Sequence, residues 1–284
     1  MAARCGKFLA AVYATVAIDD WGQRMDLGIA GKKAIVCAAS KGLGKACAMS
    51  LAKNGADLVI NARTLADLEA TAAEIRAATG RSVTVVAADI GTAEGRASVL
   101  AACSAPDILV NNAGGPARGD FEDWDEAAWM QAVNLSMIAP LMLIKAVMDG
   151  MCARRFGRIV NITSGTVKMP LPDHALSQGP RAGLTAVCAG LARKLAPHNV
   201  TINGLLPGQH LTERMQTGLL EAARRSGQTH AEMIAKRVAD IPAGRVGDPF
   251  EFGEACAFLC SAHSGYIVGQ NLLLDGGRFN STLG

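Results

Sequence analysis

Aromatic residues are scarce in this sequence: they make up 4% of the 284 residues, and only two residues are tyrosines. The hydrophobic half of the chain therefore consists mainly of alanine, valine, leucine and other small or aliphatic side chains. Such side chains let helices approach a sheet closely and pack densely against it. The composition predicts a large core of helices packed on a sheet.

Charge is also limited, with 19% charged residues and a net charge of +3. No basic run interleaved with aromatic residues occurs in the sequence. A small, dispersed positive charge does not create the surface that nucleic acids or anionic membranes need. We therefore expect no nucleic-acid or membrane partner, and we expect a small-molecule substrate instead.

The eight cysteines include no Cys-x-x-Cys pair, which argues against a structural zinc site. They are scattered through apolar stretches, and Cys256 and Cys260 have the spacing of one helix face. Cysteines of this kind behave as small buried side chains in a reducing compartment. We expect a cytoplasmic protein.

Residues 1–24 precede the folded pattern, which begins near Met25. Arg4 and Lys7 followed by the apolar run 8–17 weakly resemble a signal peptide. We favour an N-terminal extension that is dispensable, and a targeting segment is the alternative.

From residue 32, short β-branched runs alternate with helical stretches rich in alanine and leucine. Continuous apolar strands between helices indicate a parallel sheet covered on both faces. No linker or repeat interrupts the pattern, so we expect one doubly wound α/β Rossmann domain over residues 25–284. The expected strands are 34–38, 57–62, 82–89, 107–114, 158–163, 200–208 and 271–277, and the expected helices are 43–54, 65–79, 93–104, 126–153, 177–196 and 249–261. Residues 208–245, with helical pieces at 214–225 and 229–239, are expected to form a substrate lid.

The turn after the first expected strand has the composition of a phosphate-binding loop. Its glycines let backbone N–H groups approach a pyrophosphate, and the helix that follows adds positive potential at its N-terminus. The segment therefore predicts a dinucleotide site. The predicted cofactor-binding residues of this turn are Ala38, Ser40, Lys41, Gly42, Leu43 and Gly44.

Residues 37–44 are similar to the T-G-x-x-x-G-x-G segment of the short-chain dehydrogenase/reductase family, with Ala38 in place of the first glycine. NNAG at 111–114, Asn134 in VNL, Ser164 in NITS, PG at 207–208 and YIVGQNLLLDGG at 266–277 follow in the family's order. Over residues 26–278 the sequence thus resembles this family, and within it the 3-oxoacyl-carrier-protein reductases. The resemblance implies hydride transfer between a carbonyl and an alcohol, and a homodimer or homotetramer.

The resemblance also assigns cofactor contacts along the chain. Asp89 and Ile90 would hold the adenine, and Asn112, Ala113 and Gly114 would line the ribose side. Pro207, Gly208 and Thr212 match the family's nicotinamide-side loop.

The choice between NAD(H) and NADP(H) is predicted from the charges of the side chains at the end of the second expected strand. An NAD enzyme carries an acid there for the ribose 2′-hydroxyl, but this chain has Ala62 followed by Arg63. Lys41 supplies a second cation, and a 2′-phosphate needs such donors. We therefore expect NADP(H).

The family's catalytic Tyr and Lys positions are altered. Asn134 and Ser164 match the family's Asn and Ser, but the Tyr position holds Ser177 and the Lys position holds Arg181. A serine hydroxyl is a far weaker acid than a phenol, whose pKa is about 10. Arg181 can bind ribose hydroxyls, but a pKa above about 12 makes it a poor proton exchanger.

Two histidines are candidate substitute acids: His210 after the PG turn, and His174 just before Ser177. Each is equally compatible with a surface loop. The leading hypothesis is an NADP(H)-dependent oxidoreductase with an atypical proton-transfer site. The alternatives are a cofactor-binding protein without hydride chemistry, and a lyase or hydrolase derived from the fold.

Overall fold

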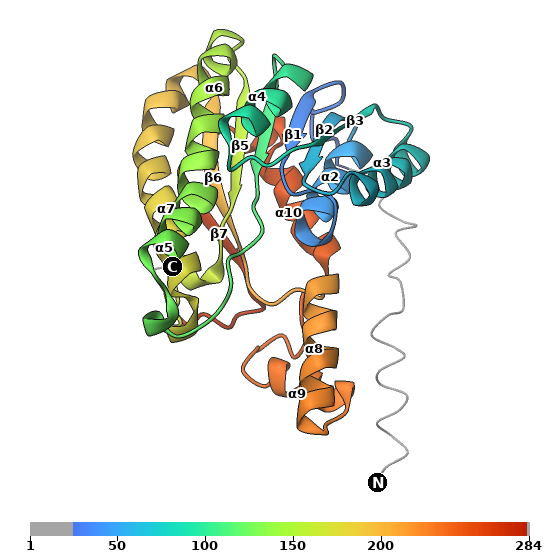
Figure 1. Ribbon diagram of the computed structural model, residues 1–284. Coiled ribbons are helices and arrows are strands. Elements are labelled where there is room, and N and C mark those ends of the chain that lie inside the picture. Colours follow the sequence, from blue (N-terminus) through green and yellow to red (C-terminus); the bar gives the residue numbers. More distant parts are fainter. Residues whose placement is uncertain (1–24, 283–284) are drawn as a thin grey trace.

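A computed structural model describes residues 25–282, so the predicted N-terminal extension lies outside the described residues. Seven parallel strands form one sheet in the order β3-β2-β1-β4-β5-β6-β7 (Figure 1). This order reverses direction between β1 and β4, as in dinucleotide-binding folds. The strands are β1 (Lys33–Val36), β2 (Asp57–Ala62), β3 (Val83–Ala87), β4 (Ile108–Asn111), β5 (Gly157–Ile162), β6 (Val200–Pro207) and β7 (Asn271–Leu274).

Helices cover both faces of the sheet because successive strand side chains point to opposite sides. In β1, Ala34 and Val36 join the core on one face, and Ile35 joins the core on the other. The doubly wound prediction is confirmed. The first face carries α2 (Gly42–Lys53), α3 (Leu65–Thr79) and α10 (Pro249–Leu259), and the second carries α4 (Ala93–Ala102), α6 (Ala139–Ala153) and α7 (Ala175–Leu195).

The helix expected at 126–153 is not regular throughout. It consists of α5 (Glu126–Val133), a π-helical turn (Asn134–Ile138) and α6. Its most apolar 18-residue window has a mean hydropathy of 1.6, and the stretch alone among the described helices is long and apolar enough to span a membrane. Its α6 part packs on the sheet through Leu143, Ile144 and Val147.

The segment predicted to form the lid projects from the body of the molecule (Figure 1). It contains α8 (Glu213–Ser226) and α9 (His230–Val238). At its base, His210 and Gly247 pair in an isolated parallel bridge. On α8, Leu219 and Ala223 are buried and Leu220 is exposed.

The seven cysteines of the described region are free thiols, and six of them are buried. Burial raises the pKa of Cys37 to about 12 and that of Cys188 to about 11. Both thiols therefore stay protonated at neutral pH, and a thiolate nucleophile is not available from either. The prediction that the cysteines are mostly buried side chains is confirmed for this part of the chain.

The turn between β1 and α2 has an unusual backbone. Ala38 has a φ of +47°, a left-handed conformation that glycine adopts more easily. Gly42 also has a positive φ, and a Cβ on Gly44 would overlap the carbonyl oxygen of Ala38. The methyl group of Ala38 is therefore accommodated at the cost of backbone strain, in a turn that elsewhere depends on glycine.

We expect Ala38→Gly to stabilise the protein by up to about 1 kcal/mol. Relief of the left-handed alanine, worth about 1–2 kcal/mol, outweighs the added flexibility of the unfolded chain, worth about 0.5–1 kcal/mol. Chemical denaturation measures the change. The matched control is Ala39→Gly at the next position, which is fully buried and has no positive φ, and which we expect to destabilise. Equal destabilisation by both substitutions would contradict the strain at Ala38.

Candidate active site

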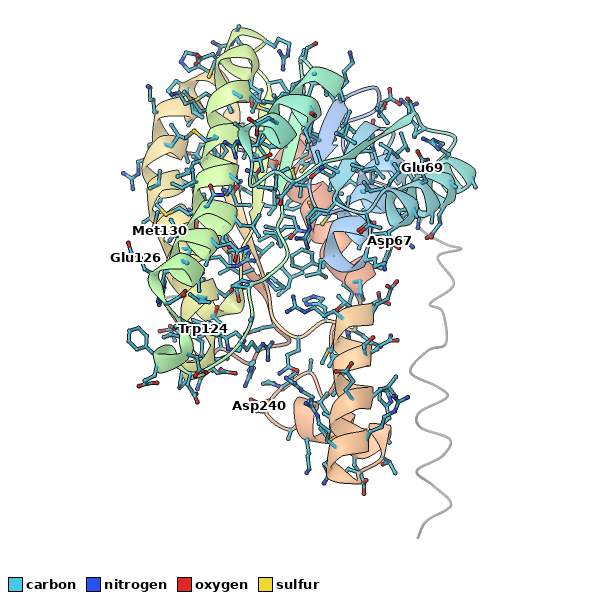
Figure 2. The ribbon with its side chains drawn as sticks, in the orientation of Figure 1. Asp67, Glu69, Trp124, Glu126, Met130 and Asp240 are labelled. Carbon is cyan, nitrogen blue, oxygen red and sulfur yellow. The ribbon has the colours of Figure 1, made fainter. Side chains whose placement is uncertain are left out.

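A cleft of about 570 Å³ opens at the carboxyl ends of the strands, beside the reversal point between β1 and β4. Figure 2 labels Trp124, which precedes α5, and Asp67, which lies on α3. Trp124 lines the cleft and was not predicted from the sequence. Among the predicted residues that line it are Ala38, Ser40, Arg63, Asp89, Ile90, Asn112, Ala113, Gly114 and Asn134.

The other predicted cofactor residues lie next to these. Lys41, Gly42, Leu43 and Gly44 form the turn and the first residues of α2. A Cβ on Gly42 would come within 3.3 Å of Thr212 Cγ2. The loop after Pro207 and Gly208 therefore reaches the turn at residues 38–44, called the phosphate turn below. Segments 38–44 and 207–212, far apart in the sequence, therefore meet at one site.

The adenosine end of the cleft is cationic and carries no acid at the end of β2. Arg63 is exposed there and makes no hydrogen bond or ion pair within residues 25–282. Lys41 differs, because its Nζ lies 3.0 Å from Asp67 Oδ2. Of the two predicted cations, Arg63 is thus the one whose charge is not already paired.

Two asparagines fix loops at the middle of the cleft. Asn112 Nδ2 donates to the carbonyl oxygen of Ala38 at 3.3 Å, which ties the NNAG segment to the phosphate turn. Asn134 Nδ2 donates to the carbonyl oxygen of Gly91 at 2.9 Å. Asn134 begins the π-helical turn, where its backbone carbonyl accepts a hydrogen bond from the Ala139 N–H, and its exposed side chain lines the cleft.

Ser164 follows β5 and is held by Thr166, a residue that the sequence analysis did not single out. The Ser164 hydroxyl oxygen accepts hydrogen bonds from the Thr166 backbone N–H at 3.2 Å and from the Thr166 hydroxyl at 2.9 Å. A serine hydroxyl has one donor and two acceptor positions. Both acceptor positions are used, so the hydroxyl hydrogen of Ser164 is left for donation.

Arg181 points inward and is held by hydrogen bonds to the protein backbone. Its side chain is buried, with 6% of the residue exposed. The guanidinium donates to the carbonyl oxygens of Ile162 at 2.9 Å, Thr163 at 3.0 Å and Ala113 at 3.4 Å. These acceptors are the ends of β5 and the loop after β4, so Arg181 joins two neighbouring loops beneath the cleft.

A fourth hydrogen bond connects Arg181 with Ser177, the other altered position. Arg181 Nε donates to Ser177 Oγ at 3.2 Å, within the first turns of α7. Burial lowers the pKa of Arg181 to about 10, with a smaller effect from the nearby Arg214. The guanidinium stays charged at neutral pH, and it polarises the Ser177 hydroxyl toward donating its own hydrogen.

The two histidines have different surroundings. His210 is buried, its ring packs edge-on against Phe252 at 5.2 Å between centroids, and its Nδ1 has no hydrogen-bond partner among residues 25–282. Burial lowers its pKa, so the ring is neutral at neutral pH. None of its described contacts involves Ser164, Ser177 or Arg181. His174 lies next to α7, and its Nδ1 contacts Asp173 Oδ1 at 2.6 Å, which orients the ring and leaves Nε2 for another partner.

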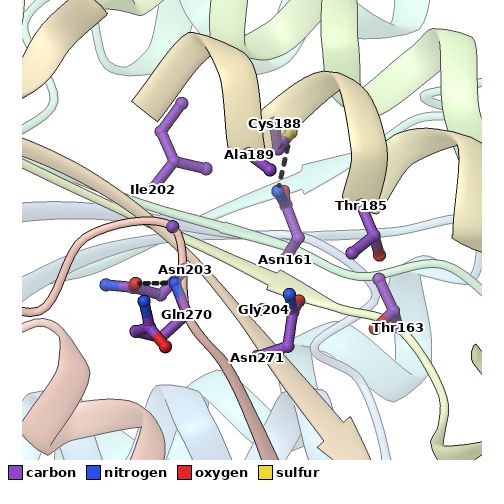
Figure 3. Close-up of a pocket in the computed structure, with 11 residues that line it drawn as sticks. Asn161, Thr163, Thr185, Cys188, Ala189, Ile202, Asn203, Gly204, Gln270 and Asn271 are labelled. Carbon is purple, nitrogen blue, oxygen red and sulfur yellow. Dashed lines mark hydrogen bonds between the residues drawn. The ribbon is translucent and has the colours of Figure 1, made fainter. Parts of the chain in front are cut away.

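A separate void lies between α7 and the strands β5, β6 and β7 (Figure 3). Asn161 Nδ2 contacts Cys188 Sγ at 3.3 Å on one side of it, and Asn203 Oδ1 accepts from the Gln270 N–H at 2.9 Å on the other. Its volume of about 10 Å³ holds no more than about one water molecule. The substrate and cofactor therefore need the larger cleft.

Comparison with known proteins places this geometry in a family. The family model described as enoyl-(acyl carrier protein) reductase matches residues 37–278. The chain is 31% identical over 255 residues to the NADPH-dependent reductase BacG of Bacillus subtilis, covering 88% of this chain and 98% of that protein. It is 32% identical over 257 residues to the 3-oxoacyl-[acyl-carrier-protein] reductase FabG of Vibrio cholerae, covering 89% and 99%.

Solved structures agree with this placement. The L-sorbose reductase of Gluconobacter frateurii, in complex with NADPH and L-sorbose, superimposes with a TM-score of 0.87 at 29% identity, covering 90% of this chain and all of that one. YwfH, an NADPH-dependent reductase involved in bacilysin biosynthesis, gives a TM-score of 0.82 at 31% identity, covering 89% of this chain and all of that one. The chain belongs to the short-chain dehydrogenase/reductase family.

Proposed function

We propose that the protein is an NADP(H)-dependent oxidoreductase that interconverts a carbonyl and an alcohol. The observation that carries the proposal is the single cleft that runs from the phosphate turn and Arg63 past Asn112 to Asn134. The NADPH-dependent reductases among the relatives support the same cofactor.

The residues present fit a dinucleotide phosphate. The positive φ of Gly42 and the absence of a side chain on Gly44 shape the turn in front of the α2 N-terminus, where backbone N–H groups attract phosphate. Arg63 would meet the 2′-phosphate, Asp89 and Ile90 would border the adenine, and Asn112 would lie on the ribose side. Bound NADPH would supply the hydride.

The proton side of the reaction would rest on an arrangement that differs from the family pattern. Ser164, its acceptor positions filled by Thr166, would donate a hydrogen bond to the substrate oxygen. Ser177, polarised by Arg181, would donate a second one. Donors aimed at an oxygen where negative charge develops stabilise the transition state. His174, oriented by Asp173, is the better placed of the two histidines to return a proton through solvent.

We also propose a cytoplasmic homodimer or homotetramer. The stretch Glu126–Ala153 is strongly apolar, yet only 39% of its most apolar window is buried within one chain. Met130, Met142, Val187 and Leu272 are exposed on α5, α6, α7 and β7. An interface between copies of the chain would cover these side chains.

We expect the protein to bind NADPH more tightly than NADH, with Arg63 responsible. Arg63→Ala should lower NADPH affinity about ten-fold or more, since a charge-assisted hydrogen bond is worth about 1.5–3 kcal/mol. Lys41→Ala is the control and should have a smaller effect, because Asp67 already pairs with Lys41. Calorimetric titration of the three proteins with both cofactors measures this. Equal affinity of the unaltered protein for the two cofactors would contradict it.

We expect carbonyl reduction to be slow and to rise about 10²–10⁴-fold in the double variant Ser177→Tyr with Arg181→Lys, because a positioned acid contributes about that much. Arg181→Lys alone should lower the melting temperature, since a lysine cannot replace four divergent hydrogen bonds. Reductase rates on one activated ketone, with melting curves for every variant, test this.

His174→Ala and His210→Ala complete the same experiment. Loss of activity in His174→Ala identifies His174 as the substitute acid. Efficient turnover that neither histidine variant alters would rule out a histidine acid. Activity confined to the Tyr/Lys variant, with NADPH binding intact in the unaltered protein, would favour a cofactor-binding protein without its own chemistry.

A further inference from the structure

Three arginines from separate elements interact with one another beside residues 115–117, which line the cleft. Arg118 lies on the loop after β4, Arg214 begins α8, and Arg237 lies in the last turn of α9. Gly115, which lines the cleft, would place a Cβ 3.6 Å from a terminal guanidinium nitrogen of Arg214. The Gly119 N–H donates to the Asp173 carbonyl oxygen at 3.3 Å, which holds the Arg118 loop beside the start of α7.

Arg118 lies near two other positive charges and only one negative charge. Burial and the charges of Arg237 and Arg214 lower the pKa of Arg118, and only Asp173 opposes them. The Asp173 carboxylate is in contact with His174, at 2.6 Å. Arg214 also acts on buried Arg181, which donates to carbonyl oxygens and a serine and to no carboxylate. Positive charge therefore extends from the cleft mouth to the floor.

Several other arginines in the described chain pair with acids. Arg81 contacts Asp57 at 2.8 Å, and Arg245 contacts Glu251 at 2.6 Å. By contrast, the guanidinium groups of Arg118, Arg214 and Arg237 make no hydrogen bond or ion pair to any residue in 25–282. Like charges held together at a concave site focus positive potential and attract an anion. Guanidinium groups match oxyanions because they offer two parallel N–H donors.

Building on the proposed function, we infer that the substrate carries an oxyanion, a carboxylate or a phosphate, which Arg118, Arg214 and Arg237 bind while the carbonyl faces Ser164 and Ser177. The three arginines are then specificity-determining residues. The lid residues Arg214 and Arg237 would bind the anion from one side and Arg118 from the other, so the anion would draw α8 and α9 toward the body.

The kinetic test uses pairs of substrates that differ in charge. Levulinate is compared with its methyl ester, which tests for recognition of a carboxylate. Dihydroxyacetone phosphate is compared with dihydroxyacetone, which tests for recognition of a phosphate. We expect the anionic member of at least one pair to have about a ten-fold higher kcat/KM, the value of one charge-assisted hydrogen bond. Arg118→Gln and Arg237→Gln should reduce that ratio about five- to ten-fold. Arg225→Gln removes an exposed charge from the far end of α8 and should leave the ratio unchanged.

A binding test does not depend on turnover. With NADP⁺ saturating the phosphate turn, inorganic phosphate and malonate should raise the melting temperature of the unaltered protein and of Arg225→Gln, and should do so less in Arg118→Gln. If no ketone is reduced but this pattern holds, the proposed reaction fails and the anion site stands. Equal kcat/KM for the members of both pairs, or equal effects of Arg118→Gln and Arg225→Gln, would overturn the anion site.

Discussion

Backbone hydrogen bonds between parallel strands hold the ends of the strands in register along one edge of the sheet. Val36 of β1 pairs with Val110 of β4, and Asn111 pairs with Asn161 of β5. The side chains of Asn111 and Asn161 reinforce the register with a 2.9 Å hydrogen bond. Because of this register, the phosphate turn, the loop after β4 and Ser164 emerge next to one another. The cleft and the catalytic candidates depend on that alignment.

Arg181 fixes the start of α7 against the aligned strand ends. A lysine at this position would offer one nitrogen, whereas the guanidinium offers several donors in a fixed plane. Arg181 uses them on the ends of β5, the loop after β4 and Ser177 at once. The charged group thus connects β5, the loop after β4 and the first turns of α7.

Patterns confined to short stretches of the sequence allowed most of the fold to be predicted, because apolar strands and the glycine-rich turn depend on local residues. Features set by distant contacts could not be predicted. The positive φ of Ala38, the π-helical turn at Asn134–Ile138 and the inward position of Arg181 depend on partners far along the chain. His210 has a polar side chain typical of a loop, but Phe252 and Gly247 enclose it. The arginine cluster was not predicted for the same reason, since Arg118 lies about 100 residues before Arg214 in the sequence.

The bridge at the base of α8 and α9 has a consequence for how the chain tolerates change. The Leu211 N–H donates to the Gly247 carbonyl oxygen and the Gly247 N–H donates to the Gln209 carbonyl oxygen, both at 2.9 Å. The two ends of the segment therefore meet, and the positions of the strands do not depend on the residues between these ends. Doubling the length of such a closed excursion costs only about 0.6 kcal/mol in loop entropy. The segment is a module that can be lengthened, shortened or exchanged while the strands and the phosphate turn keep their positions.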